Sequence, residues 1–293
     1  MKHKLKTATM VVMIMCTAVF IGCEKETSSD MPEQNREVMY QVSLLQGLTY
    51  GDYHGSITVK ELKQYGDTGI GTFDKLNGEL IMLDGEVYRA AGDGSVEVVS
   101  DDETIPFSNV TFIDADKSKD FKDIPDYDAL CSELNQIVKE RGKNRFYMVR
   151  IDGMFRKVNV RSEYAQAEPY KPLVEVLEND QTFFDYENIE GTLVGLYCPP
   201  YMSDLNAVGW HLHFISKDKA KGGHVLGLDI ADAVLIWDDT DAFQMQIPQN
   251  EMFDEFDLTV DQSEDIEKVE KSQQDEENNR QKQYTMRLMI CKR

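Results

Sequence analysis

The stretch GWHLHFISKDKAKGGHVLG, residues 209–227, decides how the second half of the chain is organised. Alternate residues of a strand point to the same face, so His211 and His213 project together if WHLHF is a strand. The glycine-rich segment 217–223 can turn the chain back, and His224 then opens the next strand on the same side. The stretch therefore predicts a β-hairpin that gathers three of the five histidines of the chain.

Three imidazoles that converge from a hairpin match a catalytic zinc site, which has three protein ligands and an open fourth position. The same spacing also fits surface or core histidines that lie near one another without a metal. The pattern leaves both interpretations open and says little about the reaction. His54, alone in GDYHGS, is predicted to be an ordinary loop residue.

Two other segments carry a hairpin signal, because an Asp-Gly pair stands between runs of alternating apolar residues. In GELIMLDGEVYRA the predicted turn is Asp84-Gly85. In FYMVRIDGMFRKVNVRSE, residues 146–163, the predicted turn is Asp152-Gly153. Further strands are expected in GTLVGLYCPPY, WHLHFIS, HVLGLDI and AVLIWDD.

Helices are fewer. Residues 126–141 have helical spacing, and residues 169–180 form a second, shorter candidate. In the first helix, the residues expected on one face are Leu130, Leu134, Ile137 and Val138. The predicted class is therefore α+β, with two mixed β-sheet subdomains, a few helices, and the zinc site on a β-hairpin of the second subdomain.

The N-terminus reads as an export signal. Residues 1–22 combine a basic start with an apolar run and end at Gly22, directly before Cys23. This pattern predicts a bacterial lipoprotein signal, with cleavage before Cys23 and lipidation of its thiol; an ordinary secretory signal is the alternative. The expected protein is exported and touches a membrane only through its lipid anchor.

The remaining chain divides by composition. Residues 23–37 are polar and predict a disordered tether, followed by a β-rich subdomain at 38–145 and a zinc-binding subdomain at 146–270. Residues 271–293 form a charged tail. The formal net charge of -22 argues against a nucleic-acid partner, because phosphates need basic surfaces.

Several motifs resemble the acetolactate decarboxylase family, in the order in which that family has them. They are GIGTFDKLNGELIMLDGEVYRA at 69–90, FYMVRIDGMFRKVNVRSE at 146–163, and the segment from QTFFDYENIEGTLVGLYCPPY to HVLG at 181–227. The similarity runs from about Val42 to Pro248 and more weakly to Glu270. It implies a two-part fold of mixed sheets with helices, usually dimeric, and zinc-dependent conversion of 2-acetolactate to acetoin and carbon dioxide.

The resemblance also assigns site residues. It makes the zinc ligands His211, His213 and His224, the acidic active-site residue Glu79, and the active-site arginine Arg161. A glutamate near the C-terminal end of the family's core corresponds to Glu270, with Glu267 as the competing choice. Glu86, in the same hairpin as Glu79, is predicted to lie on a solvated face. Arg161 could instead pair with one of the many carboxylates, and Arg150 and Arg156 are nearby competitors for its role.

The chemistry explains these residue types. Loss of carbon dioxide leaves electrons that the neighbouring ketone accepts as an enediolate, and a zinc ion that binds the hydroxyl and ketone oxygens stabilises this charge. Arg161 is expected to hold the carboxylate or enediolate, and Glu79 to supply the proton. Another zinc lyase or hydrolase, or a lipoprotein that only binds zinc, would share the histidines but form no acetoin.

Overall fold

The computed structural model describes residues 35–268, apart from 115–116, 204, 263–264 and 267. The predicted signal peptide, most of the tether with Cys23, the charged tail, Glu267 and Glu270 lie outside the described residues. No helix among the residues described is long and apolar enough to cross a membrane. The described chain is mostly strand with few helices, which confirms the α+β class.

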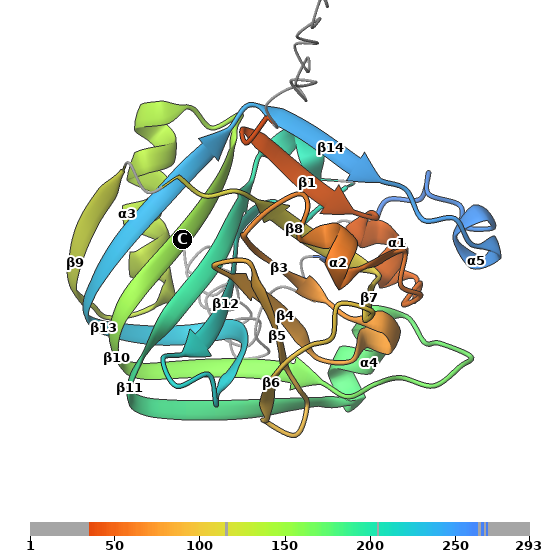
Figure 1. Ribbon diagram of the computed structural model, residues 1–293, viewed down its shortest axis with the longest axis horizontal. Coiled ribbons are helices and arrows are strands. Elements are labelled where there is room, and N and C mark those ends of the chain that lie inside the picture. Colours follow the sequence, from red (N-terminus) through yellow and green to blue (C-terminus); the bar gives the residue numbers. More distant parts are fainter. Residues whose placement is uncertain (1–34, 115–116, 204, 263–264, 267, 269–293) are drawn as a thin grey trace, which may run out of the picture. The chain divides into compact units, whose positions relative to one another are not determined.

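Three sheets account for the strands (Figure 1). The seven-stranded sheet has, in spatial order, β14 (Ala242–Gln246), β1 (Val38–Val42), β8 (Phe107–Thr111), β3 (Thr68–Thr72), β4 (Glu79–Leu83), β5 (Glu86–Ala90) and β6 (Val96–Val98). The five-stranded sheet has β10 (Phe146–Glu163), β11 (Gln181–Cys198), β12 (Gly209–Ser216), β13 (Gly222–Thr240) and β9 (Ser118–Ile124). A two-stranded sheet pairs β2 (Ile57–Thr58) with β7 (Thr104–Ile105).

The two large sheets do not coincide with the predicted ranges 38–145 and 146–270. β9 precedes residue 145 but belongs to the five-stranded sheet, and β14 follows it but pairs in parallel with β1 of the seven-stranded sheet. In the five-stranded sheet, β10 pairs with both β11 and β13, so the strands from β10 to β13 form a closed cycle of pairings.

One predicted Asp-Gly turn is confirmed and the other is wrong. Asp84 and Gly85 have φ of 54° and 77° and join β4 to β5, as a two-residue hairpin turn requires. Asp152 and Gly153 instead lie inside the continuous strand β10. There Gly153 is paired with Gly191 of β11 on one side and with β13 on the other.

Gly153 is needed for close approach between strands. A Cβ built on it would lie 2.4 Å from the Asp232 carbonyl oxygen and 2.4 Å from the Ala233 Cβ of β13. We expect Gly153→Ala to lower the free energy of unfolding by about 1–3 kcal/mol, because the strands would have to separate. Gly227→Ala is the matched control, since its Cβ would meet only Asn159, at 3.8 Å. Urea unfolding measures both, and equal stabilities would contradict the close-approach explanation.

The helices are α1 (Leu45–Thr49), α2 (Val59–Leu62), α3 (Tyr127–Arg141), α4 (Leu173–Asn179) and α5 (Glu251–Asp254), with 3₁₀ turns at Asp74–Leu76 and Pro200–Met202. The predicted long helix is confirmed as α3. It begins where the Asp126 side chain accepts a hydrogen bond from the Ala129 N–H, and it ends at Gly142, whose φ is 123°. The four apolar residues predicted on one face are all buried.

Alternation along the strands separates the core into layers. On β4, Ile81 and Leu83 pack with Ile215 of β12, whereas Leu80 and Met82 pack on the opposite face, toward α2. The five-stranded sheet in turn packs its other face against α3. Side chains an even number of residues away from Ile81 on β4, or from Ile215 on β12, therefore point into the space between the two large sheets.

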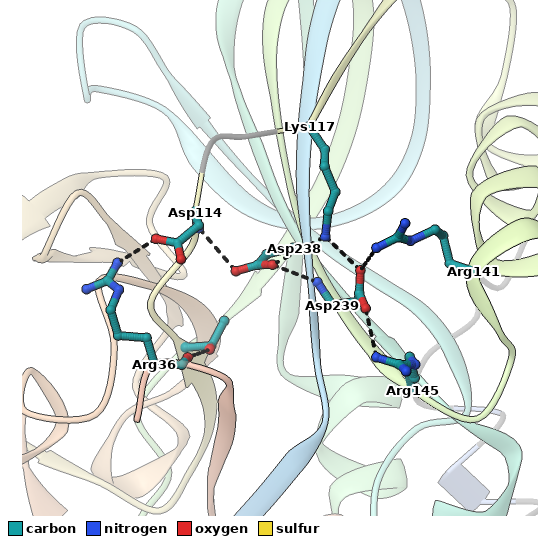
Figure 2. A network of polar contacts seen from close by, with 8 residues as sticks. Arg36, Asp114, Lys117, Arg141, Arg145, Asp238 and Asp239 are labelled. Carbon is teal, nitrogen blue, oxygen red and sulfur yellow. Dashed lines mark hydrogen bonds and ion pairs between the residues drawn. The ribbon is translucent and has the colours of Figure 1, made fainter. Parts of the chain in front are cut away.

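Asp239, near the end of β13, ties three segments together (Figure 2). Its side chain is 7% exposed and its oxygens lie 2.7 Å from Lys117 Nζ, 3.2 Å from Arg141 Nη2 and 3.1 Å from Arg145 Nη1. Burial acts to raise the pKa of Asp239, but the hydrogen bonds and charges of Lys117 and Arg141 outweigh it, so its pKa lies below the usual value.

A carboxyl group with a depressed pKa adds stability above its unfolded pKa, about 3.9, and loses it as the pH falls through the folded value. We therefore expect Asp239→Asn to lower the urea midpoint at pH 7, and the difference from the parent to shrink below about pH 4. Asp232→Asn is the control, because its pair with Lys122 is exposed and worth little. A deficit that is constant from pH 7 to pH 3 would refute a charge-based role.

Candidate active site with a three-histidine metal centre

The histidines converge because of strand alternation and register. His211 and His213 lie on β12 in the phase of Ile215, which places them between the sheets. His213 is paired directly with His224, the third residue of β13. The structure therefore brings together the three imidazoles that the sequence placed on one hairpin.

The three rings present nitrogens to a common point. His211 Nε2 lies 3.0 Å from His213 Nε2 and 3.0 Å from His224 Nδ1. Zinc–nitrogen bonds of about 2.0–2.1 Å in a tetrahedral site would put such nitrogens roughly 3.4 Å apart. Opening the triad by a few tenths of an ångström would seat a metal ion, so the donor set fits one. These residues form a candidate three-histidine metal site.

The protonation of the imidazoles favours metal binding. His213 Nδ1 lies 2.9 Å from the Leu80 carbonyl oxygen, which can only accept, so Nδ1 carries the proton and the neutral ring leaves Nε2 unprotonated. Burial, followed by the charge of Arg161, lowers the pKa of His211 to about 3. Burial, followed by His211, lowers the pKa of His213 well below its usual value. Both rings are therefore neutral near pH 7.

Glu79 reaches the triad from the other sheet. It is the first residue of β4, in the phase of Ile81, and its side chain is 8% exposed. Its Oε2 lies 3.3 Å from His213 Nε2. Glu79 is paired with Thr72 of the neighbouring strand β3. The Thr72 hydroxyl donates to the Gly78 carbonyl, 2.8 Å away, directly before Glu79. One carboxylate is therefore held beside the nitrogens that face the metal position.

Arg161 adds a positive charge to the same pocket. It lies on β10, paired with His224 of β13, and its side chain is 8% exposed. Its Nε is buried and has no hydrogen-bond acceptor among the described residues. The Glu163 carboxylate is 3.8 Å from that Nε. A buried N–H that lacks an acceptor is costly, so it marks a position where an anionic ligand would be stabilised.

Apolar side chains from two helices complete the walls. The pocket contains Glu79, Arg161, Glu163, His211 and His224 and is otherwise lined by Leu45, Leu48, Gly71, Thr72, Leu76, Phe107, Leu173 and Leu177. The leucines come from α1, α4 and the turn at Asp74–Leu76. A pocket with apolar walls and a few convergent polar groups is the usual form of a small-molecule site.

Residues weighed as competitors lie outside this pocket. Glu86 is half-exposed and pairs with Lys63. Arg150 and Arg156 each pair with two carboxylates elsewhere on the structure. His54 lies in a loop, as predicted, between Asp52 and Glu168.

Glu163 is the pocket residue that the sequence reasoning missed. It is 2% exposed and stands two residues after Arg161 on the same strand. Alternation alone places both side chains on one face, so that signal was present in VNVRSE. The apolar wall had no comparable signal, because α1 and α4 are far from β12 in sequence and short.

The lining of the pocket is that of an enzyme active site. Convergent imidazoles, a buried carboxylate and a buried guanidinium at one mostly apolar pocket are the groups expected of an enzyme that acts on a small molecule. The family model for alpha-acetolactate decarboxylase matches residues 39–260. The chain belongs to the alpha-acetolactate decarboxylase family, whose members are carboxy-lyases.

Relatives and solved structures agree with this membership. The chain is 39% identical over 248 residues to the alpha-acetolactate decarboxylase of Methanosarcina mazei, covering 83% of each chain. It is 35% identical over 246 residues to that of Bacillus subtilis, covering 84% of this chain and 95% of the relative.

Among solved structures, the crystal structure of alpha-acetolactate decarboxylase from Bacillus subtilis strain 168 superposes with a TM-score of 0.77 at 35% identity, covering 80% of this chain and all of that one. A Staphylococcus aureus protein described as similar to alpha-acetolactate decarboxylase gives a TM-score of 0.73 at 30% identity, covering 79% of this chain and 98% of that one.

Proposed function

We propose that this protein converts 2-acetolactate to acetoin and carbon dioxide with a zinc ion held by His211, His213 and His224. The observation that supports the proposal most is the convergence of three imidazole nitrogens, two of the pairs 3.0 Å apart, at the pocket that His211, His224, Arg161 and Glu79 line. Family membership supports the same reaction.

The histidines suit zinc because neutral nitrogen ligands leave the ion its full charge. Zinc bound there would act as a Lewis acid that stabilises the negative charge developing on the substrate's oxygens. The Leu80 carbonyl holds the His213 ring in the tautomer that a ligand needs.

Arg161 is proposed to bind the substrate's carboxylate. The guanidinium is permanently charged, and its buried Nε lacks an acceptor within the described chain. A carboxylate would satisfy this N–H and fix the orientation of the bond to be broken. The leucines of α1 and α4 would exclude water from the methyl groups of the substrate.

Glu79 is proposed to deliver the proton. When the bond between C2 and the carboxylate carbon breaks, carbon dioxide leaves and its electron pair moves toward the neighbouring ketone as an enediolate. One proton must then reach C2 to give acetoin. Glu79 is held on one side of the pocket, directly beside His213, and would protonate a single face, which would give one enantiomer.

The test is acetoin formation. Purified protein loaded with zinc should convert racemic 2-acetolactate to acetoin well above the spontaneous rate, and chelation should abolish the difference. Folded, zinc-loaded protein that forms no acetoin would reject the proposal in favour of another zinc lyase or hydrolase, or a zinc-binding protein. Neither alternative has its own support in the pocket, and pure metal binding has no use for Arg161 and Glu79.

Export, a lipid anchor at Cys23 and a homodimer also remain proposals. The leader and Cys23 lie outside the described residues. Membrane fractionation of the parent and of a Cys23→Ser variant would test the anchor. Only the parent should be found in the membrane fraction. Sedimentation of the soluble protein would test the dimer.

A further inference from the structure

The pocket contains a second buried carboxylate that the proposed reaction does not use. As whole residues, Glu163 is 2% exposed and Glu79 is 6% exposed, and both line the same pocket. It stands two residues after Arg161 on β10, so both side chains share one face of the strand. Neither the zinc ligands nor the proton step explains why an ionisable group should be buried here.

The burial of Glu163 is explained by its position next to Arg161. The Glu163 Oε1 lies 3.8 Å from Arg161 Nε, and the two side chains are 3% and 8% exposed. A guanidinium buried without a counter-charge is strongly disfavoured, and a carboxylate at this distance in a pocket of low polarity offsets that cost.

The separation matters as much as the pairing. At 3.8 Å the contact is too long to be a hydrogen bond, and Arg161 Nε has no acceptor among the described residues. Glu163 therefore compensates the charge of Arg161, while the Nε–H of Arg161 stays available to a ligand oxygen. The Glu163 charge also acts on Tyr53, whose pKa is raised first by burial and then by that charge.

We propose that Glu163 is the counter-ion of Arg161 and that the pair limits the pocket to ligands carrying a single negative charge. The inference rests on the proposed function in taking the ligand to be a 2-hydroxy acid. Arg161 binds one carboxylate. The zinc ion would bind the oxygens next to that carboxylate, so both cations of the pocket would already be engaged. A second carboxylate on the ligand would then meet Glu163, in a cavity where like charges repel strongly. Glu163 is thus a specificity-determining residue.

The test compares two unreactive ligands of similar size. They are 2-hydroxy-2-methylbutanoate, a monoanion, and 2-hydroxy-2-methylbutanedioate, a dianion in which a carboxylate replaces a methyl group. Their dissociation constants are measured by calorimetry on zinc-loaded protein at one ionic strength. The parent should bind the monoanion at least about tenfold more tightly than the dianion. In Glu163→Gln, the ratio of the dissociation constant of the dianion to that of the monoanion should fall by about tenfold.

Two variants serve as controls. Glu187→Gln makes the same change in net charge at an exposed site on β11 and should leave the ratio unchanged. Glu163→Asp keeps the charge and should keep the preference for the monoanion.

An unchanged ratio in Glu163→Gln overturns the inference. If that variant does not fold, the parent alone decides, because a parent that binds the dianion as tightly as the monoanion is inconsistent with the charge limit. Neither ligand reacts, so the result is independent of acetoin formation. A charge preference without acetoin would reject the proposed reaction alone, and acetoin formation without a charge preference would reject the inference alone.

Discussion

Replacing His213 by alanine is expected to remove bound zinc and to lower the rate of acetoin formation by about a thousandfold or more. Two imidazoles cannot hold the ion as three do, and the substrate loses the charge that stabilises its breakdown. The substitution also removes the hydrogen bond between His213 Nδ1 and the Leu80 carbonyl, which orients this ring toward the metal position. Metal content by atomic absorption and turnover on 2-acetolactate measure the two losses.

His54→Ala is the matched control. It removes an imidazole of the same kind from a loop outside the pocket, where the ring contacts Asp52 and Glu168. This variant should keep the parent's zinc content and turnover. A His213→Ala protein that also keeps both would show that the triad is not the metal site.

Replacing Glu79 by glutamine is expected to lower turnover by about a hundredfold to ten-thousandfold while zinc stays bound. The amide has nearly the same shape as the carboxyl group but cannot deliver the proton that C2 needs. The loss should fall on kcat, because Glu79 is proposed to act after carbon dioxide has left. Steady-state kinetics and zinc content, measured on the same preparation, separate this outcome from a loss of metal.

Glu86→Gln is the control for Glu79, because the two residues belong to the same hairpin and only Glu79 faces the triad. It should turn over at the parent rate. Parent-like turnover of Glu79→Gln would exclude Glu79 as the proton donor. The product enantiomer, measured by chiral chromatography, gives a second readout, because a proton arriving from solvent should produce both forms.

Local sequence decided some elements and not others. The helix α3 was predictable because its cap, its apolar face and its terminal glycine all agree. The two Asp-Gly pairs were indistinguishable locally, yet only Asp84-Gly85 forms a turn. At Asp152 the deciding contacts come from β11, where the Thr192 hydroxyl donates to its carboxylate at 2.6 Å. Such pairing depends on residues far along the chain.

The site shows the same division. Spacing was enough to place three histidines together, because one turn separates their strands. Spacing could not show that β4 of the other sheet lies against them, and Glu79 was assigned through family resemblance alone. Glu163 was within reach of strand alternation, but a single carboxylate in an acidic chain carries little weight until its burial is known.

The hydrogen bond from His213 to the Leu80 carbonyl has a consequence for the whole molecule. The imidazole belongs to the five-stranded sheet and the carbonyl to the seven-stranded sheet. An ion bound to the triad would add its binding free energy to the folded form only, about 2.7 kcal/mol at a free concentration one hundred times its dissociation constant. All three ligands lie in the five-stranded sheet, and the His213–Leu80 hydrogen bond connects them to the seven-stranded sheet. Metal binding would therefore also favour the arrangement in which the two sheets are packed together.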